Sequence, residues 1–316
     1  MRYVLKPAIY SKLNFEFLIK YGKKKFMAKF YLQKTLSQKV SVSGTGMHSG
    51  KKTNLTINPA PENHGIKFRR RDLPGTQDIQ AIFKLVVDTS LATVLGTNGA
   101  IVSTIEHLMA SFAGLGIDNA LVEVDDYEIP IMDGSAWVFT KLIEEAGIKE
   151  LKAPQHFIIV KKKVEVIEED KSVIIYPESS FKITCRIDFN NTLIGKQEVI
   201  FDRMKNNFGK EISKARTFGF VKDLELLKRF SLGRGGSLDN AVVIDHNRIL
   251  NEEGLRYPDE FVRHKLLDSL GDFSLLGMPI QGHIVTHKSG HALNHLFIKT
   301  LLKNKDAWET GPAKIY

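Results

Sequence analysis

The stretch at residues 259–276 constrains the fold most, because its residue spacing predicts a helix with two different faces. Apolar side chains recur at helical intervals at Val262, Leu266, Leu270 and Phe273. Ionisable side chains fall on the opposite side at His264, Asp268 and Asp272. A histidine and a carboxylate one turn apart can bind one metal ion, although a solvated polar face is the commoner explanation.

A second helix is predicted to begin at Ser103 and to end at Gly116, and it carries Glu106 and His107 near its start. Each half of the chain therefore places a histidine early in a helix, and follows that helix with glycine, a strand and another helix. This repetition predicts an α+β fold in which two similar two-layer α/β sandwich domains pack together, with the active site at their interface.

The predicted domain organisation has three parts. Residues 1–33 form an N-terminal extension that is disordered or results from a misassigned start, residues 34–154 form domain I, and residues 155–316 form domain II. A linker around Pro154 marks the boundary between the two domains. Domain II carries a strand–helix–strand insert at about 219–248, whose Phe and Leu side chains suit either extra core or the wall of an apolar groove.

The net charge of +9 is concentrated at the N-terminus, where residues 1–26 hold seven Lys or Arg and one Glu. The remainder has only a mild positive excess, which argues against nucleic-acid binding by the folded body. We find no apolar run long enough for a membrane span and no secretory signal. The basic segment is a transit peptide, a surface-binding tail, or a translated leader before a true start at Met27. The single cysteine, Cys185, fits a reducing compartment such as the cytoplasm.

Three residues from the two helices would complete a catalytic zinc site: His107, His264 and Asp268. Glu106, beside His107, could then deprotonate a water molecule. The competing explanation for Glu106 is a capping box with Ser103, in which the carboxylate serves its own helix terminus. His291, at a helix start, could be a second catalytic group oriented by Asp272. The residues alone leave unrelated surface histidines as the alternative to a metallohydrolase.

Several motifs in series resemble one enzyme family, the UDP-3-O-acyl-N-acetylglucosamine deacetylases of lipid A biosynthesis in Gram-negative bacteria. One motif is Ser103-Thr104-Ile105-Glu106-His107-Leu108. The others lie at residues 116–119, 129–135, 216–219, 261–268 and 288–294. The resemblance covers the chain from about residue 34 to the C-terminus, so it leaves the basic N-terminal segment outside.

The resemblance implies a role for each matching residue. Zinc would be held by His107, His264 and Asp268, with Glu106 as the general base and His291 as the protonated partner, itself paired with Asp272. Thr217 would help to bind the oxyanion, Phe218 would pack on the substrate, and Lys265 and Lys288 would contact its sugar-nucleotide part. The insert at 219–248 would form an apolar passage for the 3-O-acyl chain.

The expected substrate is therefore UDP-3-O-acyl-N-acetylglucosamine, and the expected products are acetate and the free amine. Fe²⁺ could replace Zn²⁺, because two histidines and one aspartate suit both ions. Two domains that share one metal favour a monomer. One rival is a zinc amidase that acts on another acylated amino-sugar. A second is a binding protein that works through its basic tail and whose histidines are structural.

Overall fold

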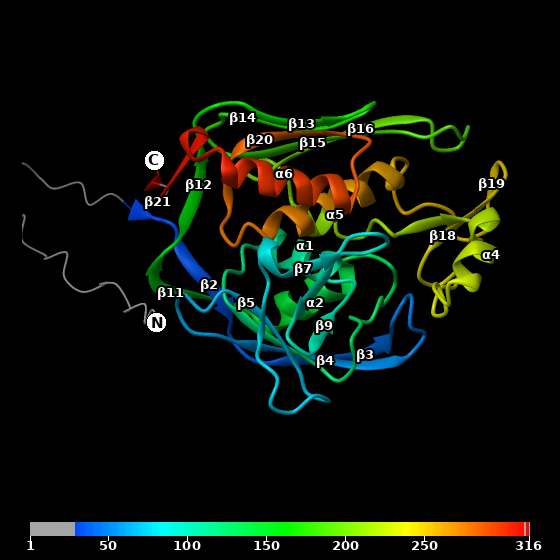
Figure 1. Ribbon diagram of the computed structural model, residues 1–316, viewed down its shortest axis with the longest axis horizontal. Coiled ribbons are helices and arrows are strands. Elements are labelled where there is room, and N and C mark those ends of the chain that lie inside the picture. The colour runs from blue at the N-terminus through cyan, green and yellow to red at the C-terminus, as the bar shows by residue number, and fades with distance from the viewer. Residues whose placement is uncertain (1–28, 313, 316) are drawn as a thin grey trace, which may run out of the picture.

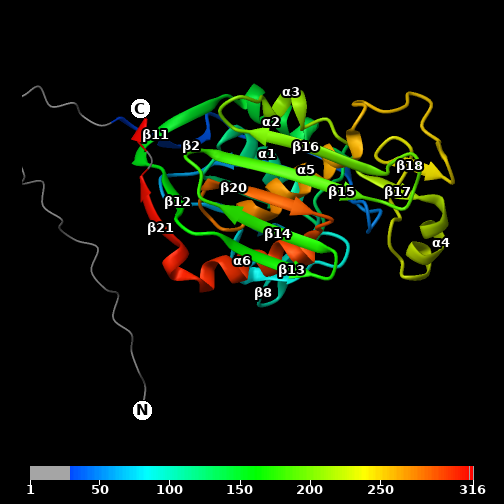
Figure 2. The ribbon, with the colours of Figure 1, turned by 90° about the horizontal axis from the view of Figure 1, so that it is seen from above.

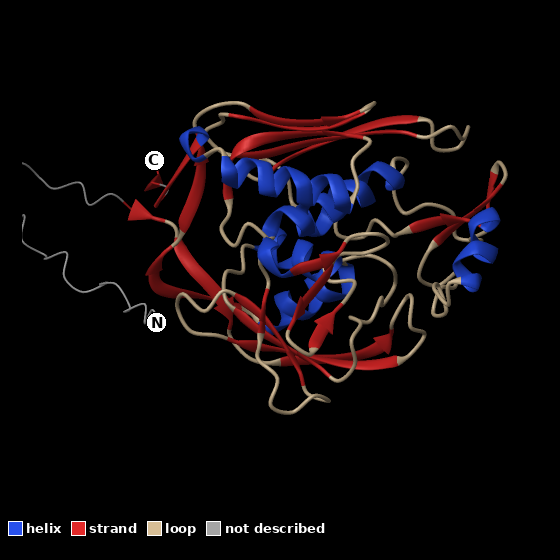
Figure 3. Ribbon diagram, in the orientation of Figure 1, coloured by secondary structure: helices blue, strands red, loops and turns tan. Residues whose placement is uncertain are grey.

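Two β-sheets form outer layers of the protein, and the main helices pack between them (Figures 1 and 3). The computed structural model describes residues 29–312, 314 and 315. From one face to the other, the layers are a sheet, helices α1 and α2, helices α5 and α6, and the second sheet. The expected α+β class is confirmed, and the apolar core fills the space between these layers.

The sheet from the first half of the chain has five strands. Their order is β3 (Val40–Thr45), β4 (Lys52–Pro59), β10 (Ala120–Val124), β5 (Ile66–Arg70) and β6 (Ile79–Gln80). Strand β4 alternates between buried and more exposed residues, with Thr53, Leu55 and Ile57 facing the helices. This period of two is the pattern of a strand with one buried face. Strands β3 and β4 pair antiparallel and form a hairpin.

The sheet from the second half has seven strands. These are β12 (His156–Val160), β13 (Val164–Glu168), β14 (Lys171–Tyr176), β15 (Phe181–Asp188), β16 (Lys196–Asp202), β20 (Ile280–His287) and β21 (Trp308–Pro312). Figure 2 shows β16, β15, β20, β14 and β13 side by side across the outer face. Strand β20 is central, and its alternate residues, including Ile280 and Ile284, are buried against the helices.

Smaller sheets complete the strand structure. The pairs are β1 (Lys29–Phe30) with β22 (Lys314–Ile315), and β2 (Leu32–Leu36) with β11 (Ile148–Pro154). A three-stranded sheet contains β7 (Val86–Asp88), β8 (Val94–Thr97) and β9 (Ala100–Val102). Another contains β17 (Phe218–Phe220), β18 (Val242–Asp245) and β19 (Arg248–Ile249), and with α4 (Val221–Arg229) it corresponds to the predicted insert.

The helices between the two large sheets are mostly buried. They are α1 (Glu106–Leu115), α2 (Trp137–Ala146), α5 (Glu260–Ser274) and α6 (His291–Lys303), with a short α3 (Phe208–Glu211) near α1. In α5 the ionisable residues His264, Asp268 and Asp272 are as buried as the apolar stripe. The solvated-face explanation of this helix is therefore wrong, because α5 is covered by the sheet on one side and by α1 on another.

Helices α1 and α5 meet backbone to backbone at Gly271. A Cβ atom on Gly271 would lie 2.1 Å from the carbonyl oxygen of Glu106, far closer than two such atoms can approach. Glycine inside a helix normally costs about 1 kcal/mol relative to alanine. Glycine is nevertheless required at position 271, because no side chain fits there. The close contact between Gly271 and Glu106 lets side chains of α1 and α5 share one site.

Gly271→Ala is expected to lower the free energy of unfolding by about 1–3 kcal/mol, because the added methyl group forces α1 and α5 apart. Chemical denaturation of the variant and the wild type measures the difference. Gly311→Ala is the matched control, since its Cβ would meet Ile159 at 3.6 Å, an ordinary van der Waals distance. Equal stability of the two variants would contradict this account of the helix contact.

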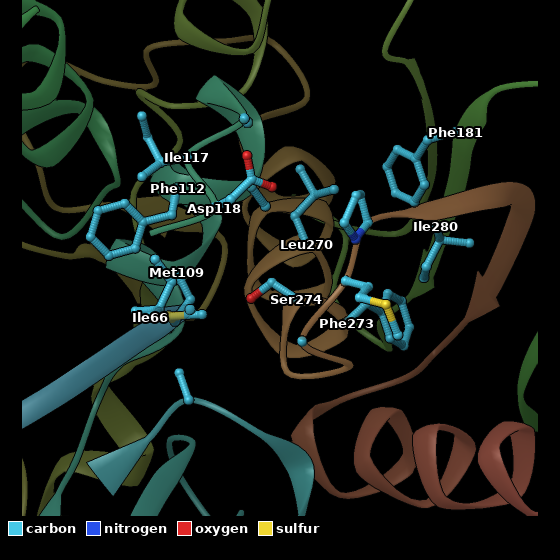
Figure 4. Close-up of a pocket in the computed structure, with 18 of the residues that line it drawn as sticks. Ile66, Met109, Phe112, Ile117, Asp118, Phe181, Leu270, Phe273, Ser274 and Ile280 are labelled. Carbon is cyan, nitrogen blue, oxygen red and sulfur yellow. The ribbon is translucent and has the colours of Figure 1, made fainter. Parts of the chain in front are cut away.

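A cavity of about 140 Å³ lies between the C-terminal ends of α1 and α5 (Figure 4). Met109, Phe112 and Ile117 line it from the α1 side, and Leu270 and Phe273 line it from α5. None of the residues predicted to bind metal or substrate is among its described lining residues. The described lining of the cavity is therefore distinct from the predicted site residues, although Asp272 lies between Leu270 and Phe273 in α5.

The predicted domain boundaries stay a prediction. Strand β2 begins at Leu32, so regular structure starts before residue 34, where domain I was expected to begin. The remainder of the predicted extension, residues 1–28, lies outside the described residues. No helix in the described part of the chain has the length and apolar character needed to cross a membrane.

Candidate metal centre and active site

Three ligand atoms converge between α1 and α5. His107 comes from the first turn of α1, and His264 and Asp268 lie one turn apart on α5. The Oδ1 atom of Asp268 lies 3.6 Å from Nε2 of His107 and 3.3 Å from Nε2 of His264. One ligand atom from each residue lies within 4.8 Å of the other two, so a single ion can contact all three. The three predicted ligands are thus brought together from both halves of the chain.

The ring of His264 is held in the orientation that a metal ligand needs. Its Nδ1 atom lies 3.1 Å from the backbone carbonyl oxygen of Ala215, which can only accept a hydrogen bond. Burial lowers the pKa of His264 to about 3, so the ring is neutral at ordinary pH. The proton therefore sits on Nδ1, and the lone pair of Nε2 faces His107 and Asp268. A carbonyl partner of this kind is typical of metal-binding histidines.

The two carboxylate oxygens of Asp268 have different surroundings. Nζ of Lys265 donates to Oδ2 at 2.9 Å, whereas Oδ1 is buried and has no hydrogen-bond partner among the described residues. Burial by itself would raise the pKa of Asp268, but neighbouring groups, the ammonium of Lys265 among them, outweigh it and hold the pKa well below its usual value. A buried, ionised oxygen without a donor is costly unless it binds a cation. The residues present therefore fit a divalent metal ion.

Glu106 occupies a different place from the one that a capping box would give it. Helix α1 begins at Glu106 itself, and Thr104 takes a left-handed backbone conformation with φ of 61°, so Ser103 is not at the helix cap. The capping-box explanation is wrong for this reason. The Oε2 atom of Glu106 instead accepts a hydrogen bond from the backbone N–H of Thr93 at 3.1 Å. Burial raises the pKa of Glu106, which brings its proton affinity closer to that of a base acting near neutral pH.

His291 and Asp272 form a buried ion pair beside this cluster. Nδ1 of His291, at the first residue of α6, lies 2.9 Å from Oδ2 of Asp272. Asn294 donates to the same oxygen at 2.8 Å. Burial alone would lower the pKa of His291, but Asp272, with a smaller contribution from Glu106, outweighs it and raises the pKa to about 10. The imidazole is therefore protonated at neutral pH, as expected for a group that donates a proton.

The segment that carries Thr217 and Phe218 is anchored to the start of α5. Arg216 is only 1% exposed, and its Nε and backbone N–H both lie 2.9 Å from Oε1 of Glu260, which is fully buried. This ion pair fixes Ala215, whose carbonyl contacts His264, on one side and Thr217 on the other. The backbone N–H of Thr217 donates to Gly134, so only its hydroxyl is left to meet a ligand.

Phe218 forms an aromatic wall next to the metal ligands. Its ring is 5.0 Å from that of Phe261, 5.6 Å from that of Phe189 and 6.2 Å from the imidazole of His264, measured between centroids. Nζ of Lys265 lies 5.7 Å from the centroid of the same ring. Strand β17 starts at Phe218, so the insert at about 219–248 begins directly beside the site.

The two lysines predicted to contact the substrate lie in different surroundings. Lys265 is part of the cluster through its bond to Asp268. Lys288 instead pairs at 2.5 Å with Asp170, an exposed residue before β14, and the structure gives it no contact with the metal ligands. Lys288 directly follows β20 and comes three residues before His291. It therefore lies at the edge of the site rather than inside it.

Two side chains in the site were not identified from the sequence. Thr93 contacts Glu106 and Asp272, and Asn294 contacts Asp272. Thr93 stands in an irregular stretch before β8, where no motif marks it. Asn294 lies three residues after His291 on one helix face, and that spacing was the available signal.

Comparison with known proteins identifies the family. A family model described as UDP-3-O-acyl N-acetylglycosamine deacetylase matches residues 33–303. The chain belongs to this deacetylase family. The matched segment contains helices α1, α5 and α6, which pack between the two large sheets. It therefore includes every metal-ligand and proton-transfer residue described above.

Individual relatives of this deacetylase family cover nearly the whole chain. A UDP-3-O-acyl-N-acetylglucosamine deacetylase of Myxococcus xanthus (strain DK1622) is 50% identical over 284 residues, which is 90% of each chain. An enzyme of the same name from Teredinibacter turnerae is 50% identical over 88% of this chain and 92% of its own length. A third, from Syntrophus aciditrophicus, is 45% identical over 89% of each chain. Similarity of this extent includes both halves of the fold.

Proposed function

We propose that this protein is a metal-dependent hydrolase that removes the N-acetyl group of UDP-3-O-acyl-N-acetylglucosamine, releasing acetate and leaving a free amine in lipid A biosynthesis. The observation that carries the proposal is the buried cluster in which three metal-ligand atoms, a base with a raised pKa and a protonated histidine come together. Membership of the deacetylase family supplies the substrate class. All of these side chains belong to one chain, so a monomer suffices, and the lone buried thiol of Cys185 suits the cytoplasm.

Zinc is the metal that we propose, with iron(II) as the alternative. His107, His264 and Asp268 would hold it through two imidazole nitrogens and one carboxylate oxygen, the ligand set of a catalytic zinc site that keeps a position open. When bound, the metal supplies a Lewis acid that polarises a carbonyl oxygen and makes water more acidic. Lys265, by binding Oδ2 of Asp268, directs Oδ1 towards the other two ligands.

The remaining residues supply proton transfer and charge stabilisation. Glu106 accepts a proton from the attacking water, since its carboxylate is buried beside the ligands and its pKa is raised. His291 carries a proton at Nε2, because Nδ1–H is held by Asp272, and it donates that proton to the departing amine. The hydroxyl of Thr217 contributes a hydrogen bond to the oxyanion that forms on the acetyl carbonyl.

The proposal is tested by measuring acetate release from UDP-3-O-acyl-N-acetylglucosamine with the purified full chain. The assay is run on the protein as prepared, after chelation, and after zinc or iron(II) is restored. We expect activity to be lost on chelation and regained with metal. Metal-loaded protein that releases no acetate from this substrate, but does so from another acylated amino-sugar, would replace the proposed substrate. Protein that binds no metal would overturn the proposal.

Phe218→Ala is expected to lower kcat/KM for the acylated substrate by about 10- to 100-fold, since one buried aromatic contact is worth roughly 1.5–3 kcal/mol. The physical reason is that the ring forms the wall between the metal ligands and the insert. An analogue without the long acyl chain is the control, because it cannot use that wall. An equal loss for both substrates would show that Phe218 acts on the metal site rather than on acyl-chain binding.

A further inference from the structure

Thr93 contacts both halves of the proton-transfer machinery although it lies outside all the motifs noted in the sequence. It precedes β8, and its side chain is 2% exposed. Its hydroxyl lies 2.6 Å from Oδ1 of Asp272 and 3.3 Å from Nδ1 of His291. Its backbone N–H lies 3.1 Å from Oε2 of Glu106. One residue therefore joins the general base on α1 to the aspartate–histidine pair on α5 and α6.

The direction of each hydrogen bond follows from the partners. An ionised carboxylate only accepts, so the hydroxyl proton of Thr93 is donated to Asp272. The lone pairs of the same oxygen are then left to face the Nδ1–H of His291, which Asp272 also accepts. This arrangement is consistent only with a proton on Nδ1 of His291, and it leaves Nε2, the other ring nitrogen, out of the bonds to Asp272.

The backbone of Thr93 is fixed on both sides. Its N–H donates to the Glu106 carboxylate, and its carbonyl oxygen accepts from the N–H of Ile105, the residue before α1, at 3.4 Å. The first bond determines which way the Glu106 side chain points, because Oε2 must stay within reach of a rigid donor. Without this bond the buried Glu106 carboxylate would have no hydrogen-bond donor among the described residues, whereas Asp272 would still be held by His291 and Asn294.

We propose that Thr93 is a positioning residue, which sets the placement of Glu106 relative to the Asp272–His291 pair so that proton removal and proton donation occur on one substrate. This inference rests on the proposed deacetylase function. The alternative is that Thr93 is a buried threonine whose hydroxyl only satisfies its own hydrogen-bonding need by donating to Asp272. Removal of the Thr93 hydroxyl lowers kcat if the residue has a positioning role, and it leaves kcat unchanged under the alternative.

The test compares Thr93→Val, which keeps the shape and removes the hydroxyl, with Thr93→Ser, which keeps the hydroxyl. We expect T93V to lower kcat by about 10- to 100-fold, the effect of one hydrogen bond to a charged group, with KM changed less than about 3-fold. T93S should recover most of kcat. Metal content should equal that of the wild type in both variants, because Thr93 supplies no ligand atom to the metal triad.

Thr53→Val is the matched control for the loss of a buried hydroxyl. Thr53 is fully buried in β4, and its Oγ1 has no hydrogen-bond partner among the described residues. We expect T53V to leave kcat and KM unchanged. A comparable loss in T53V and T93V would assign the effect to general destabilisation, and it would overturn the proposal.

A double variant shows whether Thr93 acts through Asp272. If it does, T93V adds little to the loss caused by Asp272→Asn, whereas independent roles give losses that multiply. Multiplicative losses, or T93S as slow as T93V, would overturn the proposal. If T93V does not accumulate as folded protein, Thr93→Cys takes its place, since a thiol is a weaker donor. An inactive wild type would count against the deacetylase function, whereas active wild type with equally active T93V counts against Thr93 alone.

Discussion

Replacing Glu106 with glutamine is expected to lower kcat by a factor of about 10²–10⁴, the usual contribution of a general base, while the bound metal stays in place. Glutamine keeps the size of the side chain, and its carbonyl oxygen can still accept the hydrogen bond from Thr93. It cannot take up a proton. Steady-state kinetics of acetate release, together with metal analysis of the same preparation, measures the two quantities separately.

The control for this variant is Asp118→Asn. Burial also raises the pKa of Asp118, but its carboxylate binds Lys34 and Gln155 at the cavity, away from the metal ligands. Loss of a buried acid at that position should affect stability and leave kcat close to that of the wild type. If E106Q turned over substrate at more than a tenth of the wild-type rate, another group would have to be the base.

Replacing Asp268 with asparagine is expected to abolish both metal binding and turnover. The amide can offer one oxygen, but it lacks the negative charge that makes Oδ1 a strong ligand, and Lys265 competes for that oxygen. Loss of a supporting hydrogen bond in such sites typically costs roughly 10- to 100-fold in metal affinity, so loss of the ligand itself should cost more. Metal titration of the chelated protein measures the affinity directly.

Two observations would separate this result from misfolding. Asp170→Asn removes an exposed carboxylate that pairs with Lys288, and it should bind metal as tightly as the wild type. The D268N variant should retain the wild-type circular dichroism spectrum, because its shape is unchanged. Full metal occupancy in D268N would show that the ion sits elsewhere, and the proposed ligand set would then be withdrawn.

Periodicity predicted the helix that carries most of the site, since α5 lies where apolar spacing placed it. It could not predict that the polar side of α5 is buried. A pattern of His264, Asp268 and Asp272 looks the same on a solvated helix as on one covered by α1. Only the second helix, with its own histidine, favoured the metal site, and that argument depended on the two halves packing face to face.

Local signals were misleading where tertiary contacts decide the backbone. The sequence from Ser103 to Glu106 has capping-box spacing, yet the left-handed conformation at Thr104 starts the helix three residues later and frees the Glu106 carboxylate for the site. Thr93 was missed for the opposite reason. Its partner Asp272 lies 179 positions away in the sequence, and a single threonine in an irregular stretch carries no pattern.

The cavity between the C-terminal ends of α1 and α5 gives the protein an uneven response to hydrostatic pressure. Pressure favours states that occupy less volume, and incompletely filled space of this kind can shrink. Where Gly271 of α5 meets Glu106 at the start of α1, by contrast, the backbones are in direct contact and little volume is left to lose. Compression should therefore act first on the walls of the cavity, while His107, His264 and Asp268 keep their spacing.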